Sequence, residues 1–296
     1  MPDPAPPSLS NAVPPLRPGG QVHAMRSVVV IPARHASRRF PGKPLVMLRD
    51  GQGEGKSLIR RTWEAACRVP GPEAVHVATD DARIRDHCAA FGASVLMTSD
   101  RCANGTERCA EAMAQLDAGI DVVVNLQGDA PLTPPWFVSG LLSALAASPN
   151  VLMATPVLRC DDRALTALLD DRRKGRVGGT TAIFDRAGNA LYFSKEVLPF
   201  AGGRDAGGDP APVFHHVGIY AYRRAGLAAY RDWPAGPLER AEGLEQLRFL
   251  ENGCPVRCVE VDPRGRSFWE LNNPVDVARI EAILAREGLP DESAPD

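Results

Sequence analysis

Two continuous apolar runs constrain the fold of this chain more than any other feature. VVVI occupies residues 28–31 and VVVNL occupies residues 122–126. A strand with one wet face alternates apolar and polar residues, so an uninterrupted run predicts a strand that is covered on both faces. Such strands belong to sheets with helices on both sides, and the runs therefore predict an α/β fold.

Short apolar runs alternate with amphipathic segments along the chain, which predicts strand-helix-strand units and parallel strands. Helices are expected near residues 57–69, 82–91, 106–118, 135–147, 239–252 and 274–287, and further strands at AVHVATD, ASVLMT, VLMATPVL and 256–261. Residues 161–179 are charged and contain glycine, which predicts a loop or lid. The runs TTAIFD, ALYFS and HHVGIYAYRR, with a turn at 186–189 and a glycine-rich loop at 201–208, predict antiparallel strands inserted at 180–223.

The ends of the chain and its composition bound the class of protein. Residues 1–24 are rich in proline and glycine, which predicts a disordered tail and makes Met25 a candidate initiator. One domain is expected at 25–287, followed by a flexible tail at 288–296. The net charge of -2 offers no general attraction for nucleic acid or a membrane. Seven cysteines without a CxxC motif predict free thiols, and with no long apolar run they indicate a cytoplasmic protein.

A cluster of cations follows the first apolar run. Pro32 ends the run, and the next eleven positions carry Arg34, Arg38, Arg39 and Lys43 without an acid. Loops at the carboxyl ends of strands bind ligands in open α/β sheets, so these cations predict a site for a polyanion such as a triphosphate. A solvated charged loop would have the same composition. Neither a Walker loop nor a GxGxxG fingerprint is present.

Two further segments carry polar groups at the ends of predicted strands or the starts of helices. Asp129 follows VVVNL directly, and a carboxylate in that place suits magnesium bound to phosphates, although it would also suit a helix N-cap. In NGTER, at residues 104–108, Asn104 or Thr106 is expected to cap a helix. A capping role is compatible with a ligand nearby.

The motifs PARHASRRFPGKPL, NGTER, QGDAP, ALYFS, HHVGIYAY and PLERAEGLEQLR, in this order, resemble those of the 3-deoxy-manno-octulosonate (Kdo) cytidylyltransferases, also called CMP-Kdo synthetases. The resemblance covers residues 28–286 and implies a Rossmann-like α/β nucleotidyltransferase fold, with a mixed, mainly parallel sheet and a small inserted antiparallel β region. The implied reaction is magnesium-assisted transfer of CMP from CTP to the anomeric hydroxyl of a 3-deoxy-2-ulosonic acid, with release of pyrophosphate. It implies surface polysaccharide synthesis, for lipopolysaccharide or capsule, by a homodimer that uses residues 180–223 as a contact.

The resemblance also implies roles for individual residues of this chain. For catalysis it implies Arg34, Lys43 and Asp129. For the nucleotide it implies Arg34, Ser37, Arg39, Lys43, Asn104, Gly105, Thr106, Arg108 and Gln127. For the sugar it implies Tyr192, Ser194, Lys195, His216, Glu245 and Gln246, with Lys195 as a candidate cation for the carboxylate. For the metal it implies Asp129 and Asn272.

Several positions depart from the family pattern. Ala130 replaces an acid in QGDEP, and Asn272 replaces the Asp expected to share the magnesium, so Glu270 is a possible substitute ligand. Cys102, Asn104 and Thr181 also differ from the usual residues, which leaves the identity of the acid open. A cytidylyltransferase for a sialic-like acid and an inactive paralogue that binds CTP or a CMP-sugar are the alternatives.

Overall fold

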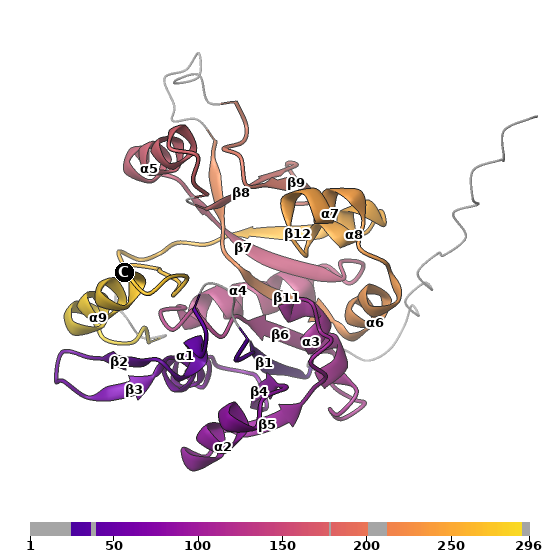
Figure 1. Ribbon diagram of the computed structural model, residues 1–296. Helices are drawn as coiled ribbons and strands as arrows, with labels where there is room; N and C mark the ends of the chain where they lie inside the picture. The colour runs from indigo at the N-terminus through magenta and orange to yellow at the C-terminus, as the bar shows by residue number, and fades with distance from the viewer. Residues whose placement is uncertain (1–24, 37–39, 178, 201–211, 292–296) are drawn as a thin grey trace, which may run out of the picture.

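The computed structural model describes residues 25–36, 40–177, 179–200 and 212–291. The tails at 1–24 and 292–296, the cations Arg38 and Arg39, and the glycine-rich loop lie outside these ranges. Within them, the chain builds one mixed sheet of ten strands and a separate two-stranded hairpin (Figure 1). The expected fold class, an α/β protein with a mixed sheet, is confirmed.

The first half of the chain alternates strands and helices as the apolar runs predict. Its elements are β1 (Ser27–Ala33), the hairpin β2 (Met47–Arg49) and β3 (Gly55–Ser57), α1 (Leu58–Ala66), β4 (Val75–Thr79), α2 (Ala82–Ala90), β5 (Ser94–Met97), α3 (Gly105–Met113), β6 (Val122–Leu126) and α4 (Pro135–Ala147). A short 3-10 helix, Lys43–Leu45, precedes the hairpin. The hairpin was not expected from the sequence, because each of its strands has only three residues.

The second half adds strands in both directions. Its elements are β7 (Met153–Arg159), α5 (Asp162–Arg173), β8 (Thr180–Phe184), β9 (Ala190–Ser194), β10 (Phe214–His216), β11 (Ile219–Arg223), α6 (Arg224–Asp232), α7 (Pro237–Glu242), α8 (Leu247–Glu251), β12 (Val256–Glu260) and α9 (Asp276–Glu287). Helix α6 is a further element that the sequence reading missed.

The strand order is β5-β4-β1-β6-β11-β7-β10-β8-β9, with β12 on the other edge of β7. Strands β5, β4, β1, β6, β7, β12 and β8 run in one direction, whereas β11, β10 and β9 run in the opposite direction. The antiparallel region expected at 180–223 is therefore part of the main sheet. Its last strand, β11, lies between β6 and β7 near the middle of the sheet.

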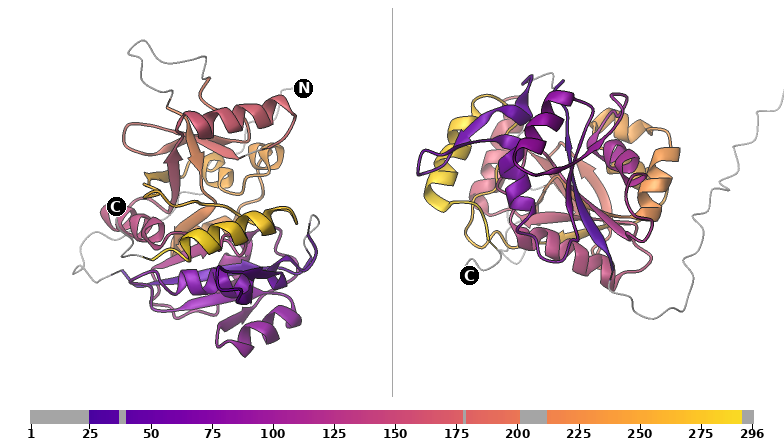
Figure 2. Two further views of the ribbon diagram at one scale, coloured as in Figure 1. Left: turned by 90° about the vertical axis from the view of Figure 1, so that its left-hand side faces the viewer. Right: turned by 90° about the horizontal axis from the view of Figure 1, so that it is seen from below.

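Both faces of the sheet are covered, which is what the continuous apolar runs predict. Along β1, Val28 and Val30 pack in a core with side chains from α3, α6 and α8, whereas Val29 and Ile31 pack on the opposite face with α1, α2 and α4. Figure 2 shows helices on both sides of the sheet when the molecule is seen from below. At about 25 cal/mol per Å² of buried apolar surface, this two-sided core is the main stabilising contribution.

Two expectations are wrong. Residues 161–179 do not form a loop throughout, because α5 occupies Asp162–Arg173; the Asp161 side chain accepts a hydrogen bond from the Ala164 amide and caps the helix. Residues 239–252 do not form one helix. The chain ends α7 at Gly243, which has a left-handed backbone with φ of 62°, and starts again at α8.

Two general expectations can also be compared with the structure. All seven cysteines are free thiols, as expected. Among the helices that the structure describes, none is long and apolar enough to cross a membrane.

Candidate active site

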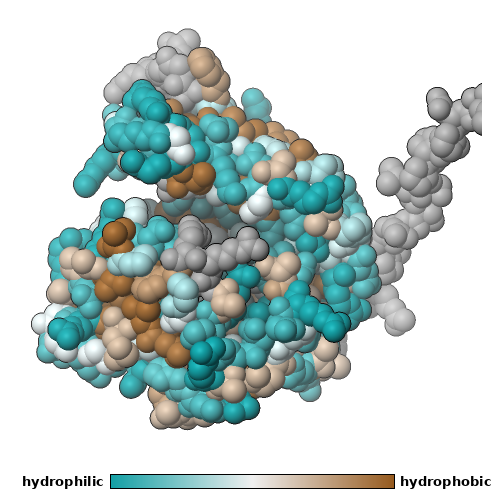
Figure 3. Space-filling model, viewed as in Figure 1, coloured by the Kyte–Doolittle hydropathy of each residue, from teal (hydrophilic) through white to brown (hydrophobic). Residues whose placement is uncertain are grey.

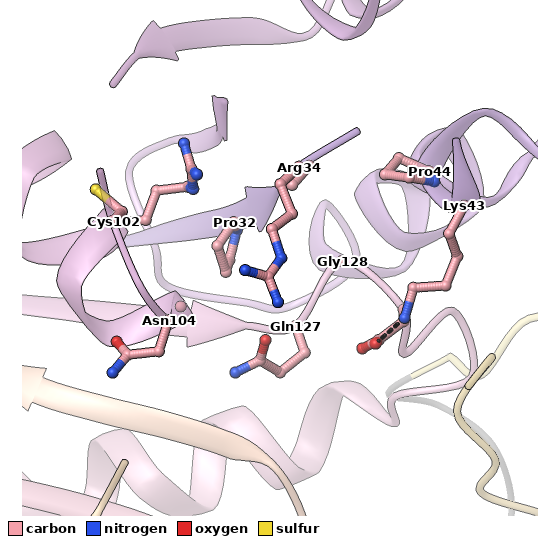
Figure 4. A pocket seen from close by; sticks show the side chains of 12 residues that line it. Pro32, Arg34, Lys43, Pro44, Cys102, Asn104, Gln127 and Gly128 are labelled. Carbon is pink, nitrogen blue, oxygen red and sulfur yellow. Dashed lines mark hydrogen bonds and ion pairs between the residues drawn. The ribbon is translucent and has the colours of Figure 1, made fainter. Parts of the chain in front are cut away.

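A pocket opens where β1 and β6 end side by side. The two strands are parallel neighbours, with Val30 opposite Asn125, so the residues that follow them meet at one edge of the sheet. The pocket has a volume of about 390 Å³ and is lined by Pro32, Ala33, Arg34, Lys43, Pro44, Cys102, Asn104, Gly105, Arg108, Gln127, Gly128 and Asp129. Figure 4 shows the Arg34 side chain extending toward Gln127, and the Lys43 side chain extending toward the loop that follows Gly128.

Lys43 and Asp129 form an ion pair in this pocket. The ammonium Nζ lies 2.6 Å from Asp129 Oδ2, and both side chains are largely shielded from solvent (Figure 4). A pair at this distance in a partly buried place holds both groups in position. The cation of the first motif and the carboxylate of the second are thus brought into contact by the fold, although 86 residues separate them.

The segment that precedes α9 passes next to Asp129. The Leu271 amide donates a hydrogen bond of 2.8 Å to the Asp129 carbonyl oxygen, which places Glu270 and Asn272 beside the pocket. Asn272 Nδ2 lies 3.5 Å from Glu270 Oε2. The next acid, Asp276, accepts hydrogen bonds from the amides of Asn272 and Asn273 and from the Trp269 indole, so its carboxylate is engaged in closing the turn.

The start of α3 forms another wall. Asn104 is the N-cap, and its Oδ1 accepts a hydrogen bond of 2.8 Å from the Glu107 amide. Gly105 leaves little room for a side chain, since a Cβ there would lie 3.2 Å from the Gln127 amide group and 3.3 Å from Asn125 Nδ2. The helix N-terminus therefore comes close to β6, and its partial positive charge favours an anionic ligand.

A second pocket, of about 470 Å³, adjoins the first. It is lined by Arg34, Ala103, Asn104, Gly105, Tyr220, Ala235, Glu239, Arg240, Gly243, Leu244, Glu245 and Gln246. Arg34, Asn104 and Gly105 line both pockets, so two ligands bound there would share one wall. Figure 3 shows the molecular surface hollowed between the part that carries α5 and the part that carries α9.

Glu245 links the two pockets through hydrogen bonds. Its Oε2 accepts a bond of 3.0 Å from the Thr106 amide, and its Oε1 accepts one of 3.3 Å from Gln127 Nε2. Burial raises the pKa of Glu245, while the bond from Thr106 acts in the opposite direction. Its neighbour Gln246 is buried and accepts a bond from the Tyr220 hydroxyl, but Gln246 Nε2 has no partner among the described residues.

The nucleotide residues predicted from sequence fall into three groups. Arg34, Lys43, Asn104, Gly105, Arg108 and Gln127 come together around the first pocket, which Asp129, predicted as a catalytic and metal residue, also lines. Thr106 is fully buried, and its hydroxyl lies 2.6 Å from the Tyr222 hydroxyl. Ser37 and Arg39 lie outside the described residues. Contact of any of these side chains with a nucleotide stays a prediction.

The predicted sugar residues divide in a similar way. Glu245 and Gln246 line the second pocket. Ser194 Oγ donates to Glu242 Oε1 at 2.7 Å, and the Lys195 amide donates to Glu242 Oε2 at 2.9 Å, so these residues gather around α7 with Tyr192 nearby. His216 is buried between Phe193 and Tyr220, with its Nε2 2.9 Å from Thr155 Oγ1. The roles of these six residues also stay predictions.

The sequence reading missed several residues around the site. Tyr220, Glu239 and Arg240 line the second pocket, and Asn125 lies fully buried under Gly105 with no hydrogen-bond partner for its side chain in the described part of the chain. Glu239 and Arg240 stand in PLERAEGLEQLR, so the motif was found but its lining residues were not. Asn125 is the only polar residue in the run VVVNL, and this was the one signal in the sequence that could have identified it.

The donor set near Asp129 suits a hard cation. One carboxylate and the amide oxygen of Asn272 on adjacent segments are ligands of the kind that magnesium takes, since it keeps several waters and needs few protein oxygens. No group of three or more His, Cys, Asp or Glu side chains with metal-binding geometry exists within the described ranges. The site would thus hold magnesium only with the help of water and a bound phosphate.

Comparisons with known proteins agree with this geometry. Residues 28–261 match the cytidylyltransferase family model. The 3-deoxy-manno-octulosonate cytidylyltransferase of Maricaulis maris is 46% identical over 89% of this chain and 99% of its own length, and the mitochondrial enzyme of that name from Arabidopsis thaliana is 38% identical over 89% and 85%.

Solved structures of cytidylyltransferases are also similar to this chain. A CMP:2-keto-3-deoxy-manno-octonic acid synthetase, solved in complex with CTP, is 33% identical with a TM-score of 0.75 over 88% of this chain and 99% of its own. At 14% identity, the 4-diphosphocytidyl-2C-methyl-D-erythritol synthase of Anaerococcus prevotii shares the fold with a TM-score of 0.52. The chain therefore belongs to the cytidylyltransferases, within the family of the 3-deoxy-manno-octulosonate cytidylyltransferases.

Proposed function

We propose that this protein transfers CMP from CTP to the anomeric hydroxyl of 3-deoxy-manno-octulosonate and releases pyrophosphate. The observation that carries this proposal is the shared wall of the two pockets, formed by Arg34, Asn104 and Gly105. A donor in the first pocket and an acceptor in the second would lie next to each other, as a transfer between them requires. The family membership supplies the identity of the two substrates.

The first pocket is suited to the nucleotide. In the reaction the acceptor hydroxyl loses its proton to water and its oxygen attacks the α-phosphorus of CTP, the bond from that phosphorus to the bridging oxygen breaks, and pyrophosphate leaves with the added charge. Arg34 and Lys43 would stabilise that charge, because fixed cations in a partly dry pocket act most strongly where charge develops. The N-terminus of α3 adds partial positive charge on the other side of the pocket, while its Thr106 and Glu107 amides already donate to Glu245 and Asn104.

Magnesium is proposed as the cofactor, held by Asp129 with Asn272 or Glu270. When bound, the ion would neutralise phosphate charge and favour departure of pyrophosphate. In this structure Lys43 forms an ion pair with the Asp129 carboxylate. When the nucleotide binds, Lys43 would leave that carboxylate and pair with the phosphates, so that Asp129 could bind the ion. The residues themselves then bind and orient the triphosphate from two sides.

The second pocket is suited to a polyhydroxylated acid. Glu245 and Gln246 offer acceptors and donors for sugar hydroxyls, and Gln246 Nε2 is a buried donor that finds no partner in the described part of the chain. Arg240 lines this pocket and is, with Lys195, a candidate partner for the sugar carboxylate. Tyr192, Ser194 and His216 would contribute from the neighbouring strands if the acceptor extends past Glu242.

The test is release of pyrophosphate from CTP and magnesium with 3-deoxy-manno-octulosonate and a panel of related acidic keto-sugars. Release with that acid alone would support the proposal, whereas release with a sialic-like acid would redirect it to the related cytidylyltransferases. If CTP binds but no acid in the panel leads to release of pyrophosphate, the result would favour an inactive paralogue. The feature that favours this alternative is Asn272, which replaces an expected magnesium ligand. We also propose that the protein is a homodimer, that it works in the cytoplasm, and that its product is used in lipopolysaccharide or capsule synthesis.

A further inference from the structure

A buried arginine joins the back of the second pocket to the first turn of α3. Arg248, on α8, is 4% exposed. Its Nε lies 2.6 Å from Glu239 Oε2, and its Nη2 lies 2.7 Å from Glu239 Oε1 and 3.1 Å from Glu107 Oε1. The guanidinium also lies over the Tyr230 ring, 4.0 Å from its centroid. One cation thus holds two carboxylates that come from different elements.

Glu107 uses its other oxygen to set the start of α3. Its Oε2 accepts a hydrogen bond of 2.8 Å from the Ala103 amide, while Asn104 Oδ1 accepts the Glu107 amide at 2.8 Å. This reciprocal pair resembles a capping box, except that Glu107 accepts from the amide one residue before the N-cap, and it fixes the chain as it enters the helix. Ala103 and Asn104 line the second pocket, and Asn104 also lines the first. The position of Glu107 therefore bears on both pockets.

A second path makes the same connection. Asn104 Nδ2 donates to the Tyr230 hydroxyl at 3.0 Å, and that hydroxyl donates to Glu239 Oε1 at 3.4 Å. Glu239 itself lines the second pocket. The contacts from Glu239 through Arg248 and Glu107 to Asn104, and back through Tyr230, form a closed ring. A closed ring of charged and hydrogen-bonded groups resists displacement of any one member.

A buried ion pair of this kind is weak support for stability, because removing the charges from water offsets most of their attraction. Hydrophobic residues of similar volume would fill the same space. What the ions add is directional geometry between α3, α6 and the α7–α8 segment. The reaction needs that geometry, since a misplacement of about 1 Å between reacting groups can cost about 100-fold in rate.

We propose that Arg248 is a positioning residue that holds the nucleotide pocket and the acid-sugar pocket in register through Glu107 and Glu239. Arg248 itself lines neither pocket. Its effect is to couple the two pockets, so that occupation of one stabilises the arrangement that the other needs. This inference rests on the proposed function for the identity of the ligands, but the coupling itself can be measured without turnover.

The experiment begins with Glu107→Gln. The Oε1 atom of glutamine can accept the same hydrogen bond from the Ala103 amide, so that bond is kept while the charge facing Arg248 is lost. In the full-length protein we expect kcat to fall roughly 10-fold or more, with the dissociation constant for CTP alone within about 2-fold of the wild type. Glu64→Gln is the matched control, because Glu64 on α1 pairs with Lys56 and Arg60 away from both pockets.

Coupling is read directly with α,β-methylene-CTP, which cannot release pyrophosphate. We expect saturating 3-deoxy-manno-octulosonate to tighten its binding to the wild type by about 5-fold or more, and Glu107→Gln to lose most of that factor. In an Arg248→Met background, Glu107→Gln should have no further effect on coupling. Thermal unfolding and circular dichroism establish which variants are folded. If Arg248→Met is not folded, the coupling measured for Glu107→Gln alone tests the inference.

Each result is decisive. A Glu107→Gln protein with wild-type kcat and coupling overturns the inference, as does one that loses CTP affinity but keeps full kcat at saturation. Additive effects of the two substitutions would overturn it too, because they would show that the residues act separately. If the wild type binds both ligands with coupling that Glu107→Gln loses, yet releases no pyrophosphate, the proposed function fails while the positioning role stands.

Discussion

At the scale of single residues, the contact between Lys43 and Asp129 joins two candidate catalytic groups. We expect Lys43→Met to lower kcat/KM for CTP roughly 100-fold, because a fixed cation near the developing pyrophosphate charge is lost. Lys56→Met is the control, since Lys56 also pairs with acids, Glu54 and Glu64, but outside the pockets. Initial rates of pyrophosphate release measure the effect. Equal losses in the two variants would remove Lys43 from the proposed machinery.

Glu270 and Asn272 flank Leu271, whose amide is bonded to Asp129. If Glu270 completes the magnesium site, Glu270→Gln should raise the magnesium concentration for half-maximal rate roughly 10-fold, because a nearby negative charge is removed. Binding of Mn²⁺ in the presence of CTP, followed by electron paramagnetic resonance, gives a second readout. Glu281→Gln, on α9, is the control. Unchanged magnesium dependence and Mn²⁺ binding would leave Asn272 as the partner of Asp129.

His216 makes the stability of the fold depend on pH. Burial lowers the pKa of His216 to about 3, and the neighbouring His215 adds to the effect. The unfolded chain binds this proton below about pH 6.5 and the folded chain does not, so stability falls as the pH drops from 7 to 5. The expected loss is on the order of 2 kcal/mol. Urea unfolding at both pH values should show a smaller difference for His216→Gln; an unchanged difference would assign the effect elsewhere.

At the scale of elements, the ends of β1 and the β6 loop are pressed together at the pocket. A Cβ on Gly128 would lie 2.7 Å from the Pro32 carbonyl oxygen, so Gly128→Ala must move backbone that lines the pocket. We expect a loss of about 1–3 kcal/mol in unfolding free energy and weaker CTP binding.

The control for this substitution is Gly140→Ala in α4. There the nearest atom to a Cβ is Val259 Cγ1 at 3.7 Å, and alanine favours the helix. Denaturant unfolding and calorimetric CTP titration compare the two. If the two alanine variants have the same unfolding free energy and the same affinity for CTP, the close approach of Gly128 to Pro32 does not affect the pocket.

Elements that follow a long apolar pattern were predicted correctly, and elements that depend on a single position were not. Helix α4 begins and ends where the sequence indicated. The segment 239–252 has helical composition throughout, but Gly243 reverses the backbone and leaves Glu245 and Gln246 between two short helices. That break is what turns both side chains toward the second pocket. A periodic pattern does not reveal such a break, because glycine is tolerated inside helices.

At the scale of the whole molecule, the expected homodimer has a candidate contact in the strand region 180–223. Leu191 on β9 is 62% exposed, which is unusual for a large apolar side chain unless another surface covers it. We expect Leu191→Glu to shift sedimentation velocity from dimer to monomer. Met47→Glu, at an exposed apolar position on the hairpin, should leave the dimer intact. A wild-type monomer would exclude this part of the proposal.

Much of the candidate site was within reach of the sequence because its motifs directly follow strands. Arg34, Lys43, Gln127 and Asp129 were found in this way, and the structure gathers them around one pocket. Asn125 and Arg248 were missed for different reasons. Asn125 was hidden inside a strand run, and Arg248 acts through partners at residues 107 and 239, a pairing that no local pattern contains.

The sequence by itself determined the α/β class, the two-sided burial of β1 and β6, and the family, because periodicity and short motifs are local properties of the chain. The tertiary structure alone decided that β11 lies between β6 and β7, that Asp129 contacts Lys43, and that Arg248 on α8 pairs with Glu107 on α3. These contacts join residues far apart in the chain. Their geometry follows from how the sheet and helices pack as a whole, which no segment specifies alone.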